Sequence, residues 1–272
     1  MASNTLVLGA VAYDAKVVPI WDGFIAWFAK RGFAFDYVLY SNYERQVDAH
    51  LRGDFHVAWN SPLAWIEAER LARKRGRAAQ AIAMRDTDCD LTSVVLVRED
   101  SPVKSLTDLR GKRIGVGAGD SPQATLIPLL AFADADVSVE VVRHDVLLGK
   151  HGDHVGGERD AVKALLAGTV DAACVIDGNR LAFAREGLGP TRVIHVTGAY
   201  DHCNMTVLDN APPEVARFRE LLLAMSYEDP EVRPLLDMEG LKAWKPGRTS
   251  GYALLERACD RFGTLDSWLA SR

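Results

Sequence analysis

The sequence predicts an α/β fold built around a mainly parallel sheet. The first ninety residues alternate short apolar segments, typical of strands, with longer amphipathic segments, typical of helices. Polar capping residues stand where those helices are expected to begin. The chain has 272 residues, 48% hydrophobic and 25% charged, which is a globular balance long enough for one large domain or two smaller lobes.

The first three strand-and-helix pairs follow from this pattern. Strands are expected at 5–11, 35–40 and 55–59, with helices at 17–31, 41–52 and 62–74. Ser41 and Glu44 have the spacing of a capping box at the start of the second helix. Ser61 followed by Pro62 is typical of the start of the third.

The elements beyond residue 90 are shorter and less regular. A long apolar strand is expected at 92–98, and a short helix, a turn and a new strand follow from Leu106. We then expect helices at 126–133 and 158–167, a Gly- and His-rich loop at 148–157, and strands at 137–143, 172–176, 193–196 and 205–208. From Pro213 onward the pattern is mostly helical.

Charge and apolar patterning exclude several classes of protein. The formal net charge of −5 argues against a nucleic-acid-binding surface. No apolar stretch is long enough to cross a bilayer, so no membrane insertion is expected. The N-terminus lacks the features of a signal peptide, which predicts a cytoplasmic location as written, or a periplasmic one if a leader was removed. Four widely spaced cysteines without a CxxC pair indicate reduced, buried thiols.

Four segments, in order, resemble the phosphate/phosphonate-binding branch of the type II periplasmic-binding-protein family. They read GDFHVAWNSPLAW from Gly53, SLTDLRGKRIGV from Ser105, DSPQAT from Asp120, and AVKALLAGTVDAA from Ala161. The resemblance covers roughly residues 5 to 230. It implies a two-lobed α/β fold with two crossing hinge strands, at 92–98 and 203–208. Lobe one would be 1–97 with 204–272, and lobe two would be 98–203.

The same resemblance implies that a small polar ligand, anionic or zwitterionic and phosphonate-like, is held in a cleft between the lobes. Ligands of open parallel sheets bind beyond the carboxyl ends of strands, where helix N-termini offer unpaired N–H groups. The candidate ligand-binding residues at such positions are Tyr13, Asn42, Tyr43, Asn60, Ser61, Ser121, Gln123, Ala124, Thr125 and Asp177. The alternative is that Ser61 only caps its helix and that Tyr13 only packs.

A second group of candidates is acidic or contains histidine. The segment from His151 to Glu158 holds two imidazoles and two carboxylates among glycines, and His202 lies at the expected return crossing. We expect the carboxylates to contact a cationic end of the ligand, and the histidines to contact the ligand as well. Metal binding is the alternative, but the spacing fits no standard motif, so neither a metal nor a cofactor is predicted. The candidates are Asp90, His151, Asp153, His154, Glu158 and His202.

Two function classes stay open at this stage. In the first, the protein is a solute-binding protein whose expected protein partner is an ABC-transporter permease. In the second, it is a cytoplasmic enzyme on the same scaffold, as in chorismate dehydratase or the thiamine-pyrimidine synthases. His202 would then be the candidate acid/base, since imidazole titrates near neutral pH. Cys203 would be a nucleophile only with a stabilised thiolate, and neighbours on a strand point to opposite faces.

Overall fold

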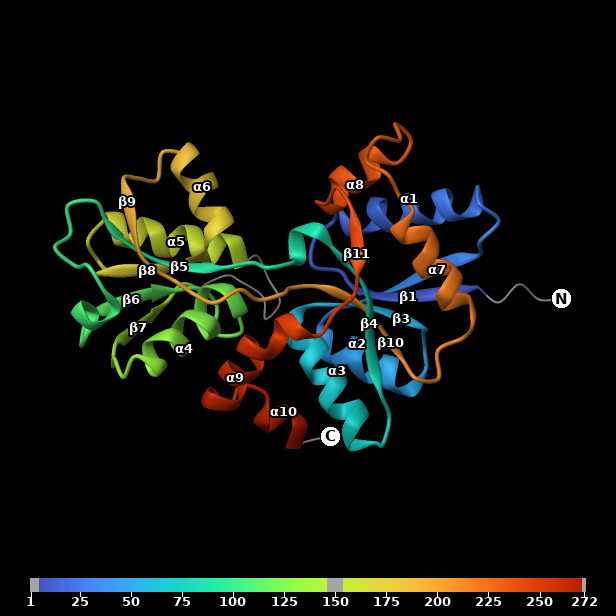
Figure 1. Cartoon of the computed structure of the whole chain (residues 1–272), viewed down its shortest axis with the longest axis horizontal. Coiled ribbons are helices and arrows are strands. Elements are labelled where there is room, and N and C mark those ends of the chain that lie inside the picture. Colours follow the sequence, from blue (N-terminus) through green and yellow to red (C-terminus); the bar gives the residue numbers. More distant parts are fainter. Residues whose placement is uncertain (1–4, 146–153, 271–272) are drawn as a thin grey trace. The chain divides into compact units, whose positions relative to one another are not determined.

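The structure is a computed structural model that describes residues 5–145 and 154–270. The chain divides into two compact units. The first unit comprises the residues up to Cys89 together with Asp201–Tyr252. The second comprises Asp90–Tyr200 and the residues from Ala253 onward. Figure 1 shows both units with most of their helices and strands labelled.

The first unit contains a six-stranded sheet of order β11-β4-β10-β3-β1-β2. Strands β1, β2 and β3 are parallel, whereas β10 runs antiparallel to both β3 and β4, and β11 runs antiparallel to β4. The predicted α/β class is therefore confirmed, with parallel pairing among β1, β2 and β3. The strands are β1 (Leu6–Val11), β2 (Phe35–Tyr40), β3 (Val57–Asn60), β4 (Ala79–Arg85), β10 (Asn204–Leu208) and β11 (Trp244–Pro246).

Helices cover both faces of this sheet (Figure 1). One face carries α1 (Val17–Ala29), α7 (Glu214–Leu223) and α8 (Arg233–Glu239), and the other carries α2 (Tyr43–Arg52) and α3 (Pro62–Lys74). Two short 3-10 helices complete the unit, η1 (Asp86–Asp88) and η4 (Ser250–Tyr252).

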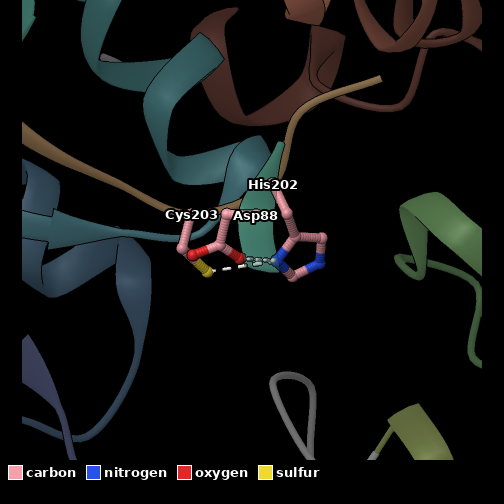
Figure 2. A group of neighbouring side chains, drawn as sticks. All are labelled: Asp88, His202 and Cys203. Carbon is pink, nitrogen blue, oxygen red and sulfur yellow. Dashed lines mark hydrogen bonds and ion pairs between the residues drawn. The ribbon is translucent and has the colours of Figure 1, made fainter. Parts of the chain in front are cut away.

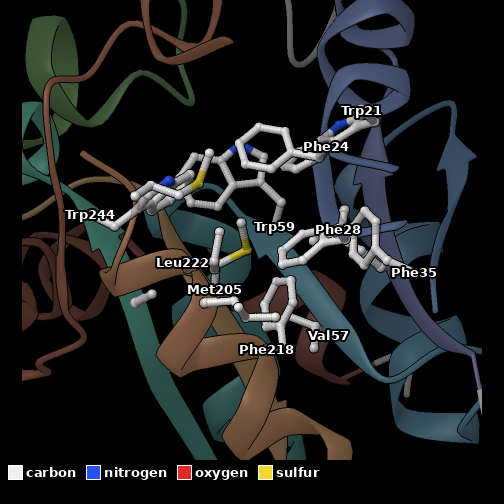
Figure 3. Packing of buried hydrophobic residues seen from close by; sticks show 14 of the residues in the cluster. Trp21, Phe24, Phe28, Phe35, Val57, Trp59, Met205, Phe218, Leu222 and Trp244 are labelled. Carbon is white, nitrogen blue, oxygen red and sulfur yellow. The ribbon is translucent and has the colours of Figure 1, made fainter. Parts of the chain in front are cut away.

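The core of the first unit is rich in aromatic side chains (Figure 3). Phe24 and Phe28 of α1 pack inward, and Phe28 lies 4.8 Å from the ring of Phe35 on β2. Phe35 stacks on Phe218 of α7 at 5.6 Å between ring centroids. This packing fixes α1 and α7 on the sheet, because buried aromatic rings remove large apolar areas from water.

The second unit contains a five-stranded sheet of order β7-β6-β8-β5-β9. Its strands are β5 (Ser93–Arg98), β6 (Arg113–Val116), β7 (Glu140–Arg143), β8 (Ala172–Ile176) and β9 (Thr191–Val196). Strands β6, β7 and β8 are parallel, and β5 is antiparallel to both β8 and β9. The helical elements are η2 (Leu106–Leu109), η3 (Pro122–Leu126), α4 (Ile127–Asp134), α5 (His154–Leu166), α6 (Asp177–Arg185), α9 (Ala253–Phe262) and α10 (Asp266–Ala270).

The apolar segments expected to cross between lobes are instead central strands of single sheets. Strand β5 lies wholly in the second unit's sheet and β10 wholly in the first unit's sheet. The chain passes between units at 89/90 and 200/201, before each of these strands, where Leu91 and Tyr200 form an isolated antiparallel bridge. A strand that is apolar on both faces is typical of a sheet covered on both sides, so apolarity does not identify a crossing segment.

Other boundaries also differ from those expected. The strands β4 and β11 and the helix α6 were not predicted, and α5 begins at His154 within the expected loop 148–157. The division into units places the chain from Ala253 onward in the second unit, whereas lobe one was expected to hold the whole C-terminus. The reason is that α9 packs on α4, where Arg257 pairs with Asp134 at 2.9 Å.

The side chains that cap α2 and α3 lie where the sequence predicted helix starts, but the capping residue of α2 differs from the one expected. Asn42, not Ser41, caps α2, because its side-chain oxygen accepts a hydrogen bond from the Arg45 N–H at 2.9 Å. Ser61 caps α3 as expected, accepting from the Ala64 N–H at 3.2 Å. Among the described residues, no helix is both long and apolar enough to cross a membrane.

Candidate functional site

One edge of the first unit's sheet gathers most of its candidate residues. Val11 pairs with Tyr40, so β1 and β2 end at the same edge, and Asn204 pairs with Asn60, so β10 begins where β3 ends. The carboxyl ends of parallel strands are the usual place for a ligand. The residues brought to this edge are Tyr13, Asn42, Tyr43, Asn60, Ser61, Arg85, His202 and Cys203.

A buried ion-pair cluster lies beyond the end of β4. Arg85 donates from Nε to Asp88 Oδ2 at 2.5 Å and from Nη2 to Oδ1 at 3.0 Å. Its Nη1 donates to the Glu239 carbonyl oxygen at 2.8 Å, and lies 3.5 Å from Glu239 Oε1. Burial alone would raise the pKa of Asp88, but the Arg85 charge outweighs it and lowers the pKa to about 2. Burial raises the pKa of Glu239 to about 7.

His202 and Cys203 join this cluster (Figure 2). The Nδ1 atom of His202 lies 3.1 Å from Cys203 Sγ and 3.5 Å from Asp88 Oδ1, and the His202 N–H donates to the Asp88 carbonyl at 2.8 Å. Burial lowers the pKa of His202, but its interactions with Cys203 and Asp88 outweigh burial and raise the pKa to about 10. The imidazole is therefore positively charged near neutral pH.

The two neighbours both enter the cluster because they precede β10 instead of lying in it. Strand β10 begins at Asn204, so the alternation of side chains along a strand does not apply to His202 and Cys203. The Asp88 carboxylate and the Cys203 thiol face the same nitrogen of His202, Nδ1, whereas a nucleophile–base–acid triad uses both nitrogens of its imidazole. The arrangement therefore lacks the geometry of a nucleophilic triad.

A chain of buried hydrogen bonds runs from this cluster across the sheet. Tyr252 OH donates to the His202 carbonyl at 2.8 Å and accepts from Asn204 Nδ2 at 2.8 Å. Thr206 Oγ1 donates to Asn204 Oδ1 at 2.6 Å and accepts from Asn60 Nδ2 at 2.9 Å. At the end of this chain of bonds, Gln46 Nε2 donates to Asn60 Oδ1 at 2.8 Å. Asn60 is fully buried within this network, and its contact with a ligand stays a prediction.

Two tyrosines lie beside the ion-pair cluster. Tyr13, which follows β1, is 47% exposed, and burial of its phenol followed by the nearby Glu239 charge raises its pKa to about 12. Tyr43, in the first turn of α2, is half-buried, and burial followed by the Cys203 charge raises its pKa. Both phenols are therefore protonated at neutral pH and can donate hydrogen bonds.

The corresponding edge of the second unit carries the Ser/Thr-rich loop. Ser121, Gln123, Ala124 and Thr125 are all buried, and Ser121 caps η3 by accepting from the Ala124 N–H at 3.2 Å. Thr125 Oγ1 donates to the Ala118 carbonyl at 2.8 Å, and the N–H groups of Thr125 and Leu126 donate to Ser121. These donors are used inside the loop, so its expected contact with an anion stays a prediction.

Neighbouring polar groups hold this loop in place. Ser93 Oγ, at the start of β5, donates to the Gln123 carbonyl at 2.6 Å and lies 2.7 Å from Tyr200 OH. The side-chain oxygen of Gln123 is buried and has no hydrogen-bond partner among the described residues. A buried acceptor of this kind costs about 1–3 kcal/mol unless something donates to it.

The described acidic candidates of the second unit are Glu158, Asp177 and Asp90. Glu158 is fully buried and accepts from the Ile176 N–H at 2.9 Å and from Asn179 Nδ2 at 3.0 Å, which ties α5 to the end of β8. Asp177 pairs with Arg180 at 2.6 Å. Asp90 is exposed, with φ of 56°, and stands at the junction between units. His151 and Asp153 lie outside the described residues, as does the side chain of His154.

Several residues of these sites were not predicted from the sequence. They are Arg85, Asp88, Glu239, Asn204 and Tyr252 in the first unit and Ser93 and Tyr200 in the second. Recognising Ala79–Arg85 as a strand would have placed Arg85 at its carboxyl end. No sequence signal pairs it with Glu239, which lies 154 residues away.

A family profile described as "ABC transporter, phosphonate, periplasmic substrate-binding protein" matches residues 10–252. Several solved structures are similar in fold. PhnD1 from Prochlorococcus marinus, in complex with methylphosphonate, is 17% identical with a TM-score of 0.68, covering 96% of this chain and 99% of that one. The binding component of an ABC phosphonate transporter from Pseudomonas aeruginosa is 16% identical with a TM-score of 0.59, covering 98% and 96%.

The periplasmic aliphatic sulphonate binding protein SsuA from Escherichia coli is 17% identical with a TM-score of 0.56, covering 96% of this chain and 87% of that one. At these identities the likeness shows the fold alone, and that fold is the two-lobed α/β scaffold expected from the sequence.

Proposed function

Because the chain belongs to the family of periplasmic substrate-binding proteins of phosphonate ABC transporters, we propose that its ligand is a phosphonate or a closely related small oxyanion. Membership makes the protein a substrate-binding protein for a small molecule. It lends no support to the alternative of a cytoplasmic enzyme. Asp88 and Cys203 both face Nδ1 of His202, so these three residues do not form a nucleophilic triad.

The observation that carries this proposal is the collection of hydrogen-bond donors at the carboxyl edge of the first unit's sheet. The protonated phenols of Tyr13 and Tyr43 and the imidazole of His202 can all donate, and an oxyanion is bound by convergent donors. In the second unit, contact of an anion with the Ser121–Thr125 loop stays a prediction, and it would require a hydroxyl or N–H of the loop to turn outward.

We extend the proposal to the protein's partner and location. Family members act with an ABC-transporter permease on the periplasmic side of the membrane, and we propose the same partner and compartment for this chain. Co-purification with a phosphonate ABC-transporter permease would support this part, and absence of any complex in the presence of ligand would contradict it.

Calorimetric titration of the purified full chain tests the ligand class. Methylphosphonate is the probe, with inorganic phosphate and methanesulfonate as competitors. Tyr43→Phe should weaken methylphosphonate binding at least about tenfold, since a hydrogen bond to a charged group contributes about 1.5–3 kcal/mol. Tyr37→Phe is the matched control, because the Tyr37 phenol bonds Asp22 away from this edge.

Ser121→Ala combined with Thr125→Ala should have an effect of similar size. Equal affinity for methylphosphonate and methanesulfonate would argue against a phosphonate-selective site. No measurable binding of any of the three oxyanions would overturn the proposal.

A further inference from the structure

Three side chains of metal-ligand type converge at one point of the first unit (Figure 2). Asp88 comes from η1, and His202 and Cys203 come from the segment that leads into β10. One ligand atom from each, a carboxylate oxygen, an imidazole nitrogen and a thiol sulfur, all lie within 4.8 Å of one another. Asp88 and Cys203 are 2% and 8% exposed, whereas the His202 side chain is 24% exposed.

The separations fit a tetrahedral ion. With Zn–S near 2.3 Å and Zn–N or Zn–O near 2.0–2.2 Å, tetrahedral angles place neighbouring ligand atoms about 3.3–3.6 Å apart. The observed separations are 3.1 Å between His202 Nδ1 and Cys203 Sγ, and 3.5 Å between Nδ1 and Asp88 Oδ1. Both separations from His202 Nδ1 therefore lie within about half an ångström of tetrahedral values. The ligand atoms of Asp88 and Cys203 lie within 4.8 Å of each other.

The positive charge of Arg85 argues against a cation at this point, because Arg85 already pairs with Asp88. An ionised carboxylate has about four lone-pair sites, and Arg85 uses one on each oxygen, so Oδ1 keeps an acceptor position. Metal-ligating carboxylates are commonly held by a hydrogen-bond donor of this kind, which fixes their orientation. Arg85 can therefore act as the group that orients Asp88 toward an ion.

The chemistry of the three ligands selects the ion. Cys203 Sγ and Asp88 Oδ1 both face a single ring nitrogen of His202. Either a hydrogen on Nδ1 or a metal bound by all three atoms can occupy this point. Thiolate and imidazole together favour zinc over calcium or magnesium, which prefer oxygen ligands. Three protein ligands leave the fourth tetrahedral position open.

We propose that Asp88, His202 and Cys203 form a binding site for a zinc-like divalent ion with one open coordination position. All three ligand atoms come from the protein, so the metal site can be tested without a phosphonate, although it shares His202 with the proposed phosphonate-binding donors.

Cobalt and zinc titrations of the tag-free, chelator-treated full chain test the proposal, with no phosphonate present. Co²⁺ should bind once per chain and produce a sulfur-to-cobalt charge-transfer band, and Zn²⁺ should displace it. Cys203→Ser should abolish the band, and both Cys203→Ser and His202→Gln should weaken Zn²⁺ binding by more than the roughly 10–100-fold typical of losing an outer-shell partner.

The matched control is Cys89→Ser, which changes the half-buried thiol next to Asp88 in the sequence and should leave the titration unchanged. Circular dichroism of each variant checks that the fold is retained. The proposal would be overturned by a wild-type protein without the band, by a Cys203→Ser variant that keeps it, or by its loss in Cys89→Ser.

Discussion

The two sheet edges of this protein differ in how they satisfy buried polar groups. At the edge of the first unit, an ion-pair cluster around Arg85 adjoins a chain of side-chain hydrogen bonds that reaches Gln46. At the edge of the second unit, hydroxyls of Ser93, Ser121 and Thr125 bond mainly to backbone groups of one loop.

This difference predicts unequal tolerance to substitution. Removing one member of a buried ion-pair network leaves the others charged and unpaired, which costs several kcal/mol. Removing a hydroxyl that bonds to the backbone leaves one neutral group unsatisfied, which costs less. The first unit should therefore be the more sensitive one, and four measurements address that expectation.

The largest effect is expected for Arg85→Met. This change leaves Asp88 and Glu239 buried without their shared cation and should lower the free energy of unfolding by about 3–5 kcal/mol. Urea denaturation followed by fluorescence would measure it. Arg217→Met is the control, because the exposed Arg217–Glu220 pair should contribute less than about 1 kcal/mol. Equal losses in the two variants would remove the contrast between buried and exposed pairs.

Lowering the pH should reduce the stability of the first unit, because the buried His50 resists protonation in the folded state. This residue is 2% exposed and stacks on Phe55, and burial lowers its pKa from 6.5 to about 4. The unfolded chain therefore binds the proton first as pH falls. Stability is full above about pH 6.5, declines through the interval down to pH 4, and has then lost about 3 kcal/mol.

His50→Gln should flatten this part of the profile, since glutamine does not titrate. Denaturant midpoints measured at several pH values between 4 and 7.5 would show it. A variant profile parallel to that of the wild type would mean that other groups cause the acid sensitivity.

Thr206→Val tests the hydrogen-bond chain itself. The substitution keeps the volume of the side chain but leaves Asn60 Nδ2 and Asn204 Oδ1 without their partner, at a cost of about 1–3 kcal/mol. Thermal and urea unfolding would report it. In the second unit, Thr107→Val changes an exposed threonine and should leave stability nearly unaltered. If Thr206→Val is equally neutral, the chain of hydrogen bonds contributes little to stability.

The smallest effect is a gain in the second unit. Gly178 lies in α6 with no atom within 4 Å of an added Cβ, so Gly178→Ala should stabilise the protein by about 0.4–1 kcal/mol. Gly187→Ala provides the contrast, because Gly187 has φ of +87° and an alanine there is strained. A stability loss in Gly178→Ala would indicate a packing constraint on α6.

Local patterns in the sequence predicted the local structure. The alternation of apolar segments located β1, β2, β3 and the helices between them, because burial of one face imposes its period on the residues. Ser61 followed by Pro62 marked the start of α3 for the same kind of reason. The fold family followed from four such segments in order.

The sequence by itself thus determined the α/β class, the fold family and the positions where polar residues follow strands. Tertiary structure alone decided which of those residues meet: the insertion of β10 between β3 and β4 brings His202 and Cys203 to Asp88, more than one hundred positions earlier. The physical reason is that such contacts depend on the order of strands in the completed sheet, whereas periodicity and caps record only interactions between residues a few positions apart.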